Sequence, residues 1–73
     1  MSDTQAALRI SLNGEPRTIA SGQTVATLLT DLGLDRRKVA VERNEAIVSR
    51  SAYETTAIEH GDKFEIVHFI GGG

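Results

Sequence analysis

Hydrophobic and polar positions alternate at the start of the chain and predict a β-hairpin. Within residues 7–12, apolar side chains occupy every second position, which places them on one face of a strand. Asn13-Gly14 follows at once, and this dipeptide readily adopts the positive φ angles of a two-residue turn. Residues 17–19 can then return as the second strand.

The next segment changes to a helical period. From Val25 to Leu32, apolar residues recur at i, i+3, i+4 and i+7, which gives one apolar stripe. Thr24 can cap the start, because its hydroxyl can accept a bond from a free helix N–H. Gly33 can supply a left-handed C-terminal cap. We therefore expect a helix over residues 25–32.

Strand-like patterns return after the helix. Residues 39–43 alternate as a third strand, Asn44-Glu45 can form a turn, and residues 47–48 can form a short fourth strand.

The last third of the chain begins with a polar segment and ends in the longest strand signal. Residues 51–59 are expected to form a loop over the sheet edge, anchored by Tyr53 and Ile58. A turn at His60-Gly61-Asp62 precedes a predicted strand over residues 63–70.

These elements predict one α+β domain. A right-handed crossover through the helix sets the last strand parallel to the first, which gives one mixed sheet with one helix across it. The domain spans residues 1–73; we expect residues 1–6 to be disordered and residues 71–73 to form a flexible tail. A chain of 73 residues with 40% apolar residues supports one modest core, so a deep catalytic cleft is not expected.

Composition narrows the classes of function. Eight basic and ten acidic residues give a net charge of −2, and only Arg36-Arg37-Lys38 clusters basic charge, so we expect no nucleic-acid partner. Cysteine is absent, which removes disulfides, thiolate nucleophiles and zinc–thiolate sites. No apolar run approaches the ~20 residues of a membrane span. We expect a cytoplasmic protein without a membrane partner, monomeric when free.

The histidines and the acidic residues are not expected to bind a metal or to act in catalysis. His60 and His68 have no further ligands at metal-binding spacing, so no metal site is expected. Several carboxylates are expected to lie on a solvated face instead of acting as general acids or bases: Asp31, Asp35, Glu42 and Glu45.

The glycines at the end of the sequence suggest a delivery arm. Gly71, Gly72 and Gly73 carry no side chains, and three extended residues reach about 10 Å. They follow the last predicted strand without a linker, so the fold fixes where the arm begins. We expect Gly71 and Gly72 to thread into a partner's active site and the Gly73 carboxylate to react there. The alternative is a loose end without function.

Apolar residues beside this arm are candidate docking residues. On the last strand, Phe64, Ile66 and Ile70 alternate onto the core face together with His68, which leaves Val67 and Phe69 on the opposite face. We take Val67 and Phe69, with the adjacent Ile70, as a docking patch for a partner. The alternatives are that the helix or a loop covers them, or that they are isolated surface apolar residues.

A carboxylate needs a leaving group before it can be attacked, and the sequence has no phosphate-binding glycine loop for ATP. No cofactor is expected on this chain, and activation must come from a partner. An activated Gly73 carbonyl could accept sulfur to give a thiocarboxylate, or an amine or thiol to give a conjugate.

The order and spacing of short motifs resemble the ThiS family, sulfur carriers of thiamin thiazole synthesis within the ubiquitin-like β-grasp proteins. The resemblance covers the chain after residue 7 and implies a β-grasp fold with about five strands packed on one helix. It rests on Leu12-Asn13-Gly14, Thr24-Val25 with Leu28-Leu29, Val39-Ala40-Val41-Glu42-Arg43-Asn44, Ile47-Val48-x-Arg50, Gly61-Asp62 and Glu65-Ile66-Val67.

The resemblance implies that this protein is a carrier and not an enzyme. A ThiF-type enzyme would adenylate Gly73 with ATP and magnesium, a cysteine desulfurase would supply sulfur, and thiazole synthase (ThiG) would receive it. Some relatives are fused to thiazole synthase, so a free Gly73 carboxylate is an assumption.

Two residue patterns depart from the family. Ser49 stands where family members usually have proline, and the sequence ends in three glycines where some members have two. Three alternative functions stay open: a MoaD-like molybdopterin sulfur carrier, a non-catalytic β-grasp interaction module and, least supported, a stand-alone enzyme.

Overall fold

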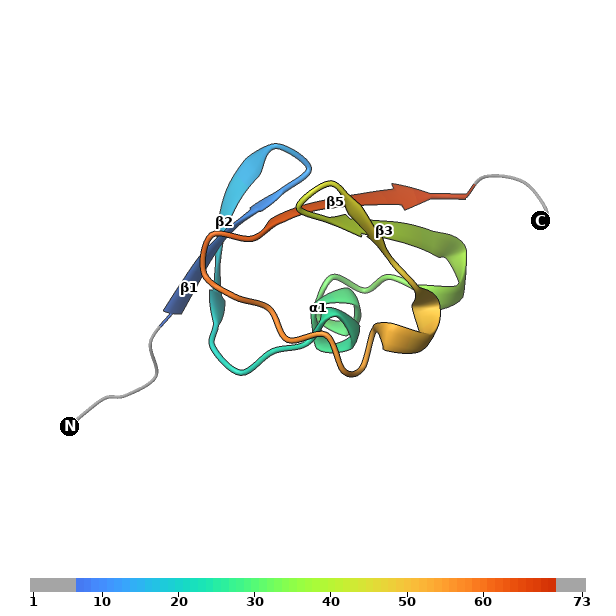
Figure 1. The fold of residues 1–73 in the computed structure, drawn as a ribbon, viewed down its shortest axis with the longest axis horizontal. Coiled ribbons are helices and arrows are strands. Elements are labelled where there is room, and N and C mark those ends of the chain that lie inside the picture. Colours follow the sequence, from blue (N-terminus) through green and yellow to red (C-terminus); the bar gives the residue numbers. More distant parts are fainter. Residues whose placement is uncertain (1–6, 70–73) are drawn as a thin grey trace.

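The computed structural model describes residues 7–69 (Figure 1). It contains five strands, one α-helix and two short 3₁₀ helices. In chain order these are β1 Ala7–Leu12, β2 Glu15–Ala20, α1 Val25–Asp31, η1 Arg36–Lys38, β3 Val39–Arg43, β4 Ala46–Val48, η2 Arg50–Ala52 and β5 Lys63–His68.

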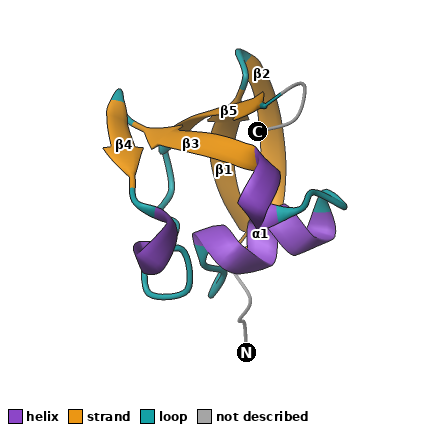
Figure 2. Ribbon diagram, turned by 90° about the vertical axis from the view of Figure 1, so that its right-hand side faces the viewer, coloured by secondary structure: helices purple, strands orange, loops and turns teal. Residues whose placement is uncertain are grey.

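The five strands form one mixed sheet in the order β2-β1-β5-β3-β4. The last strand, β5, lies in the centre, parallel to β1 and antiparallel to β3. The helix lies across one face of the sheet and leaves the other face uncovered (Figure 2). The predicted mixed sheet with one crossing helix is therefore confirmed.

The opening hairpin forms as its turn dipeptide predicts. Asn13 and Gly14 have φ angles of 51° and 84°, and Leu12 pairs directly with Glu15. β2 therefore begins two residues earlier than predicted and extends to Ala20, because the tight turn brings the chain back into register at once.

The helix has the predicted apolar face, and reciprocal hydrogen bonds cap it. The Thr24 hydroxyl accepts from the Thr27 N–H, and the Thr27 hydroxyl accepts from the Thr24 N–H. The helix ends at Asp31, one residue before the predicted end, and Gly33 follows with a φ of 74°. Among residues 7–69, no helix has the length and apolarity to cross a membrane.

The segment before β5 packs against the start of α1. The Val25 N–H donates to the Thr56 carbonyl and the Ala26 N–H donates to the Tyr53 carbonyl, at 3.0 and 2.9 Å. Tyr53 and Ile58 are buried, as predicted for the anchors of this segment. The buried apolar core is Ile10, Val25, Leu28, Leu29, Val39, Val41, Tyr53, Ile58 and Phe64.

The last strand differs from its prediction in two respects. β5 ends at His68 and does not include Phe69. His68 was expected on the core face beside Phe64 and Ile66, but the residue is exposed, because it lies at the open end of the space between the helix and the sheet.

Candidate functional site

The predicted reactive end, Gly73, follows the last residue of β5 by five positions. Gly73, the threading residues Gly71 and Gly72, and the docking residue Ile70 lie outside the described residues, so their roles stay predictions. The structure describes the strand β5, which leads to these residues, and the contacts of β5 define the described part of the candidate site.

A buried carboxylate holds the start of β5. Asp62 is 5% exposed and lies just before the strand. Its carboxylate accepts hydrogen bonds from Arg43 Nε at 2.9 Å, Asn44 Nδ2 at 3.1 Å and the Glu59 N–H at 2.8 Å. Its carbonyl accepts from the Ser11 N–H at 3.0 Å. Asp62 thus joins the end of β3 and the end of β1 to the start of β5.

The charge of Asp62 is stabilised by these partners. Burial alone would raise its pKa, but the hydrogen bonds from Arg43, the Glu59 N–H and Asn44 together outweigh this and lower the pKa from its ordinary value. Asp62 therefore acts as an ionised structural anchor.

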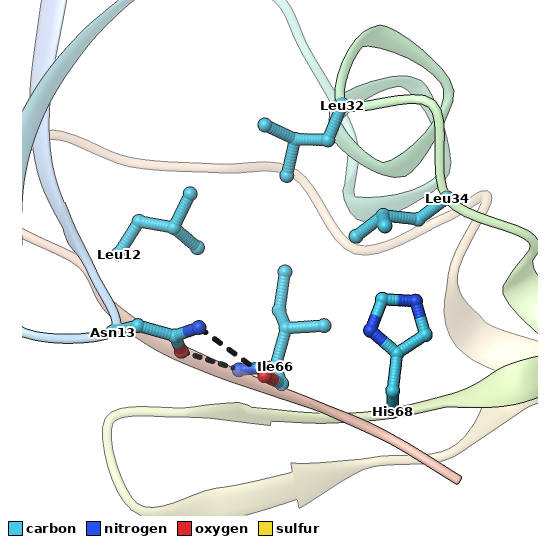
Figure 3. A pocket seen from close by; sticks show the side chains of 6 residues that line it. All are labelled: Leu12, Asn13, Leu32, Leu34, Ile66 and His68. Carbon is cyan, nitrogen blue, oxygen red and sulfur yellow. Dashed lines mark hydrogen bonds between the residues drawn. The ribbon is translucent and has the colours of Figure 1, made fainter. Parts of the chain in front are cut away.

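A side chain from the hairpin turn holds the middle of β5. Asn13 Oδ1 accepts from the Ile66 N–H at 2.8 Å, and Asn13 Nδ2 donates to the Ile66 carbonyl at 3.2 Å (Figure 3). The amide group imitates the backbone of a neighbouring strand residue and extends the β1–β5 pairing past Leu12. This second role of Asn13 was missed by sequence reasoning, which assigned it to the turn alone.

The end of β5 is held by β3. The Phe69 N–H donates to the Lys38 carbonyl at 2.9 Å, and this bond lies at the last described residue. The anchors at Asp62, Asn13 and Lys38 fix the direction in which the chain leaves the sheet toward residues 70–73.

Three exposed apolar side chains lie on the uncovered face of the sheet at this end. Ile47, Val67 and Phe69 are 78%, 60% and 55% exposed and are the large exposed apolar residues of the described chain. Val67 pairs with Ala40 and Ile47 with Glu42, on the face opposite the buried Val41. We call these three residues the outer patch.

The predicted exposure of Val67 and Phe69 opposite the core face is confirmed, and neither the helix nor a loop covers them. Their docking role stays a prediction. Sequence reasoning missed Ile47, because its place on the outer face follows from its pairing with Glu42 across β3 and β4.

One basic side chain without an ion pair among residues 7–69 lies near Phe69. Arg50 lines a shallow groove of about 190 Å³ together with Ile47 and Phe69. Neighbouring arginines are different, because Arg36 pairs with Glu54 and Arg37 pairs with Asp35, both within 3.1 Å.

The pair at Asp35 is a surface feature. Hydrogen bonds from the Arg37 side chain and N–H lower the pKa of Asp35 to about 2. The group is exposed to solvent, which screens the pair, so it contributes little to stability.

The two histidines have separate surroundings. His60 Nδ1 accepts from the Arg9 N–H at 3.1 Å, whereas His68 lines a groove of about 260 Å³ between the end of α1 and β5. Within residues 7–69, no three potential metal ligands lie together.

Comparison with known proteins decides the family. The sequence model of the ThiS family matches residues 10–73, a region that includes the three terminal glycines. The chain belongs to the ThiS family. It is 40% identical over 50 residues to the sulfur carrier protein ThiS of Bacillus subtilis (strain 168), which covers 68% of this chain and 76% of that protein.

Solved structures of the ThiS family share this fold. The crystal structure of a thiamine biosynthesis protein (ThiS) from Geobacter metallireducens has a TM-score of 0.75 and 33% identity, over 90% of this chain and all of that one. The predicted family and the predicted β-grasp fold are both confirmed.

Longer proteins contain a ThiS-like segment as well. The chain is 53% identical over 66 residues to a thiazole synthase of Paramagnetospirillum magneticum (strain ATCC 700264 / AMB-1). A thiazole synthase of Magnetococcus marinus (strain ATCC BAA-1437 / JCM 17883 / MC-1) is 50% identical over the same length. Each match covers 90% of this ThiS-family chain but only about a fifth of the length of the synthase.

Proposed function

We propose that this protein is a sulfur carrier for the thiazole ring of thiamin, with the Gly73 carboxylate as the group that carries sulfur. The observation that carries the proposal is the anchored strand β5, which leads directly into the glycines of a segment that matches the ThiS family through residue 73. A side-chain-free end on a rigid strand suits delivery into another protein's active site.

The chemistry divides between this chain and its partners. A ThiF-type enzyme with ATP and magnesium joins a Gly73 carboxylate oxygen to the α-phosphate of ATP and releases pyrophosphate. The terminal sulfur of a persulfide on a cysteine desulfurase then attacks the carbonyl carbon, so that a C–S bond forms and AMP leaves. A thiol cleaves the S–S bond of the resulting acyl disulfide, which releases the thiocarboxylate and leaves the thiol oxidised in a disulfide with the desulfurase cysteine. The resulting thiocarboxylate passes its sulfur to thiazole synthase in the cytoplasm, and the names of the relatives favour this acceptor over molybdopterin synthesis.

The outer patch is the proposed docking surface for these partners. Exposed apolar residues that share one face mark interaction sites in small soluble proteins. Ile47 and Phe69 line one groove near the end of β5, Val67 lies on the same face, and Arg50 adds positive charge in that groove. A partner with an apolar surface and an acidic rim would match this end of the molecule.

Intact-mass spectrometry tests the carrier function. After incubation with ATP, magnesium, a ThiF-type enzyme and a sulfur donor, the protein should gain the mass of one oxygen-to-sulfur exchange, located in the C-terminal peptide. The variant that lacks Gly73 should remain folded and show no exchange. An unchanged mass for the full chain, with partners that modify their own carrier, would refute the proposal.

The same variant separates the carrier from a non-catalytic interaction module. A module should bind its partner equally well with and without Gly73, and should show no chemical change in either case. A carrier should lose sulfur transfer completely when Gly73 is deleted, because the remaining glycines end at a different distance from the strand.

A further inference from the structure

The edge of β5 that faces β1 is open at its last residues. β1 pairs with β5 only at Ser11–Lys63 and Leu12–Phe64. The chain then turns away at Asn13, whose side chain occupies the N–H and carbonyl of Ile66. Beyond Ile66, the strand has a neighbour on the β3 side alone.

The alternation of hydrogen bonds shows which backbone groups face this open edge. The Phe69 N–H donates to the Lys38 carbonyl just before β3, and the Asn44 N–H just after β3 donates to the Lys63 carbonyl. In the antiparallel register of β3 and β5, the odd-numbered residues of β5 therefore bond to β3. Even-numbered residues face the other way, as Ile66 does toward Asn13. The N–H and carbonyl of His68 therefore point out of the sheet, and no residue among 7–69 bonds to them.

An apolar groove lies beside this edge. It has a volume of about 260 Å³ on the helix side of the sheet, between the end of α1 and β5 (Figure 3). Its lining residues come from β1, the turn after β1, the loop after α1 and β5: Leu12, Asn13, Leu32, Leu34, Ile66 and His68. A strand placed next to His68 would direct every second side chain toward this groove.

We propose that the adenylating partner adds one extended strand to β5 at His68 and places an apolar side chain of that strand in the groove. Main-chain bonds to an exposed strand edge supply affinity, and a pocket for alternate side chains supplies specificity. This inference rests on the proposed carrier function, because it concerns how the partner grips the strand that bears the reactive end.

The position of the edge favours this partner as the occupant. Gly73 follows His68 by five residues, about 17 Å when extended, so a protein that encloses Gly73 is within reach of the edge. Pairing at His68 would align the departing chain with a strand of the partner.

Amide hydrogen exchange measured by NMR tests the contact directly. In the free protein, the His68 amide should exchange rapidly, whereas the Val67 amide is protected by β3. Addition of the ThiF-type enzyme should slow exchange at His68 by more than tenfold and leave the Val67 amide protected.

A pair of proline variants provides the matched functional test. His68→Pro removes an outward-facing N–H near the tail, whereas Thr18→Pro removes an outward-facing N–H on the edge strand β2. His68→Pro should weaken binding to the enzyme about tenfold, the effect of one lost hydrogen bond in a well-ordered contact. Thr18→Pro should bind like the parent protein.

A groove variant covers the case in which His68→Pro fails to fold. Leu34→Asn places an amide in the apolar groove and should weaken binding several-fold while circular dichroism shows a folded protein. Unchanged affinity in a folded Leu34→Asn variant would contradict the proposal.

The outcomes separate strand addition from the carrier function. Normal sulfur exchange at Gly73 with an unprotected His68 amide and full binding by His68→Pro would overturn strand addition alone. Absent sulfur exchange with no binding would overturn both. Protection of His68 that rises with the concentration of the free protein would identify a second copy on the edge and overturn the proposed occupant.

Discussion

At its first residues β5 is held by polar side chains in a buried network, whereas at its last residues it presents exposed apolar side chains. Asp62 makes three side-chain hydrogen bonds at one end. Phe69 makes one backbone bond at the other and leaves more than half of its surface exposed. The buried polar end determines the position of the strand, and the exposed apolar end is available to a partner.

From this difference we expect the two ends of β5 to have separate roles, one in stability and the other in recognition of a partner. A substitution at the Asp62 end should alter folding and leave the surface for partners intact. A substitution at the Phe69 end should alter partner binding and leave folding almost unchanged. This division predicts a large loss of stability at Asp62 and a loss of binding at Phe69.

The largest effect is expected at Asp62. Asp62→Ala should lower the free energy of unfolding by about 2–4 kcal/mol, because Arg43 and Asn44 lose their buried acceptor. Urea denaturation measures the change. The control is Glu59→Ala, whose side chain is 74% exposed and lies 4.0 Å from Arg43, and which should stay within about 0.5 kcal/mol of the parent. Equal effects of the two substitutions would contradict the anchor role.

The charge of Asp62 should make part of this stability dependent on pH. Its pKa is lowered in the folded state, so its contribution is present above the ordinary value of about 3.9 and is lost as the pH falls through the lower folded value. Unfolding measured at about pH 6 and about pH 3 should show a smaller acid loss for Asp62→Asn than for the parent. Asp35 contributes equally to both proteins, so an identical loss would exclude Asp62 as a cause.

The outer patch should matter for binding more than for folding. Phe69→Ser should weaken binding to the ThiF-type enzyme about tenfold, or ~1.4 kcal/mol, because an exposed aromatic anchor is lost. The free energy of unfolding should change by less than about 0.5 kcal/mol. Calorimetry measures the first and urea denaturation the second. Arg17→Ser, on the exposed strand β2, is the control; parent-like binding by Phe69→Ser would remove Phe69 from the docking surface.

The parts of the fold that the sequence predicted are those governed by neighbouring residues. The Asn13-Gly14 turn, the helix stripe from Val25 and the Thr24 cap depend on a few adjacent positions, and all three form as expected. The boundaries of β2 and β5 were less accurate, because pairing with other strands determines where a strand begins and ends.

The parts that the sequence did not predict arise when distant residues meet. Arg43 and Asp62 lie 19 positions apart and Asn13 and Ile66 lie 53 apart, so no local pattern connects them. Alternation identified Val67 and Phe69 as outward-facing, but Ile47 joined them only once β4 was placed in the sheet. The role of the terminal glycines stays a prediction, because Gly71, Gly72 and Gly73 lie outside the described residues.

The smallest effect is expected at Ser49, which leads from β4 into η2. Ser49 has a φ of −68°, which a proline ring adopts without strain, and its N–H has no acceptor among residues 7–69. Ser49→Pro should therefore raise the free energy of unfolding by about 0.4–1 kcal/mol, because the ring restricts the unfolded chain.

Ser49→Ala is the control for this gain. It removes the hydroxyl that lies 3.5 Å from the Ser51 hydroxyl without restricting the backbone. If proline stabilises and alanine does not, the gain comes from the unfolded state. A loss of stability in Ser49→Pro would contradict this prediction. It would show that the Ser49 N–H stabilises the connection between β4 and η2 in the folded protein.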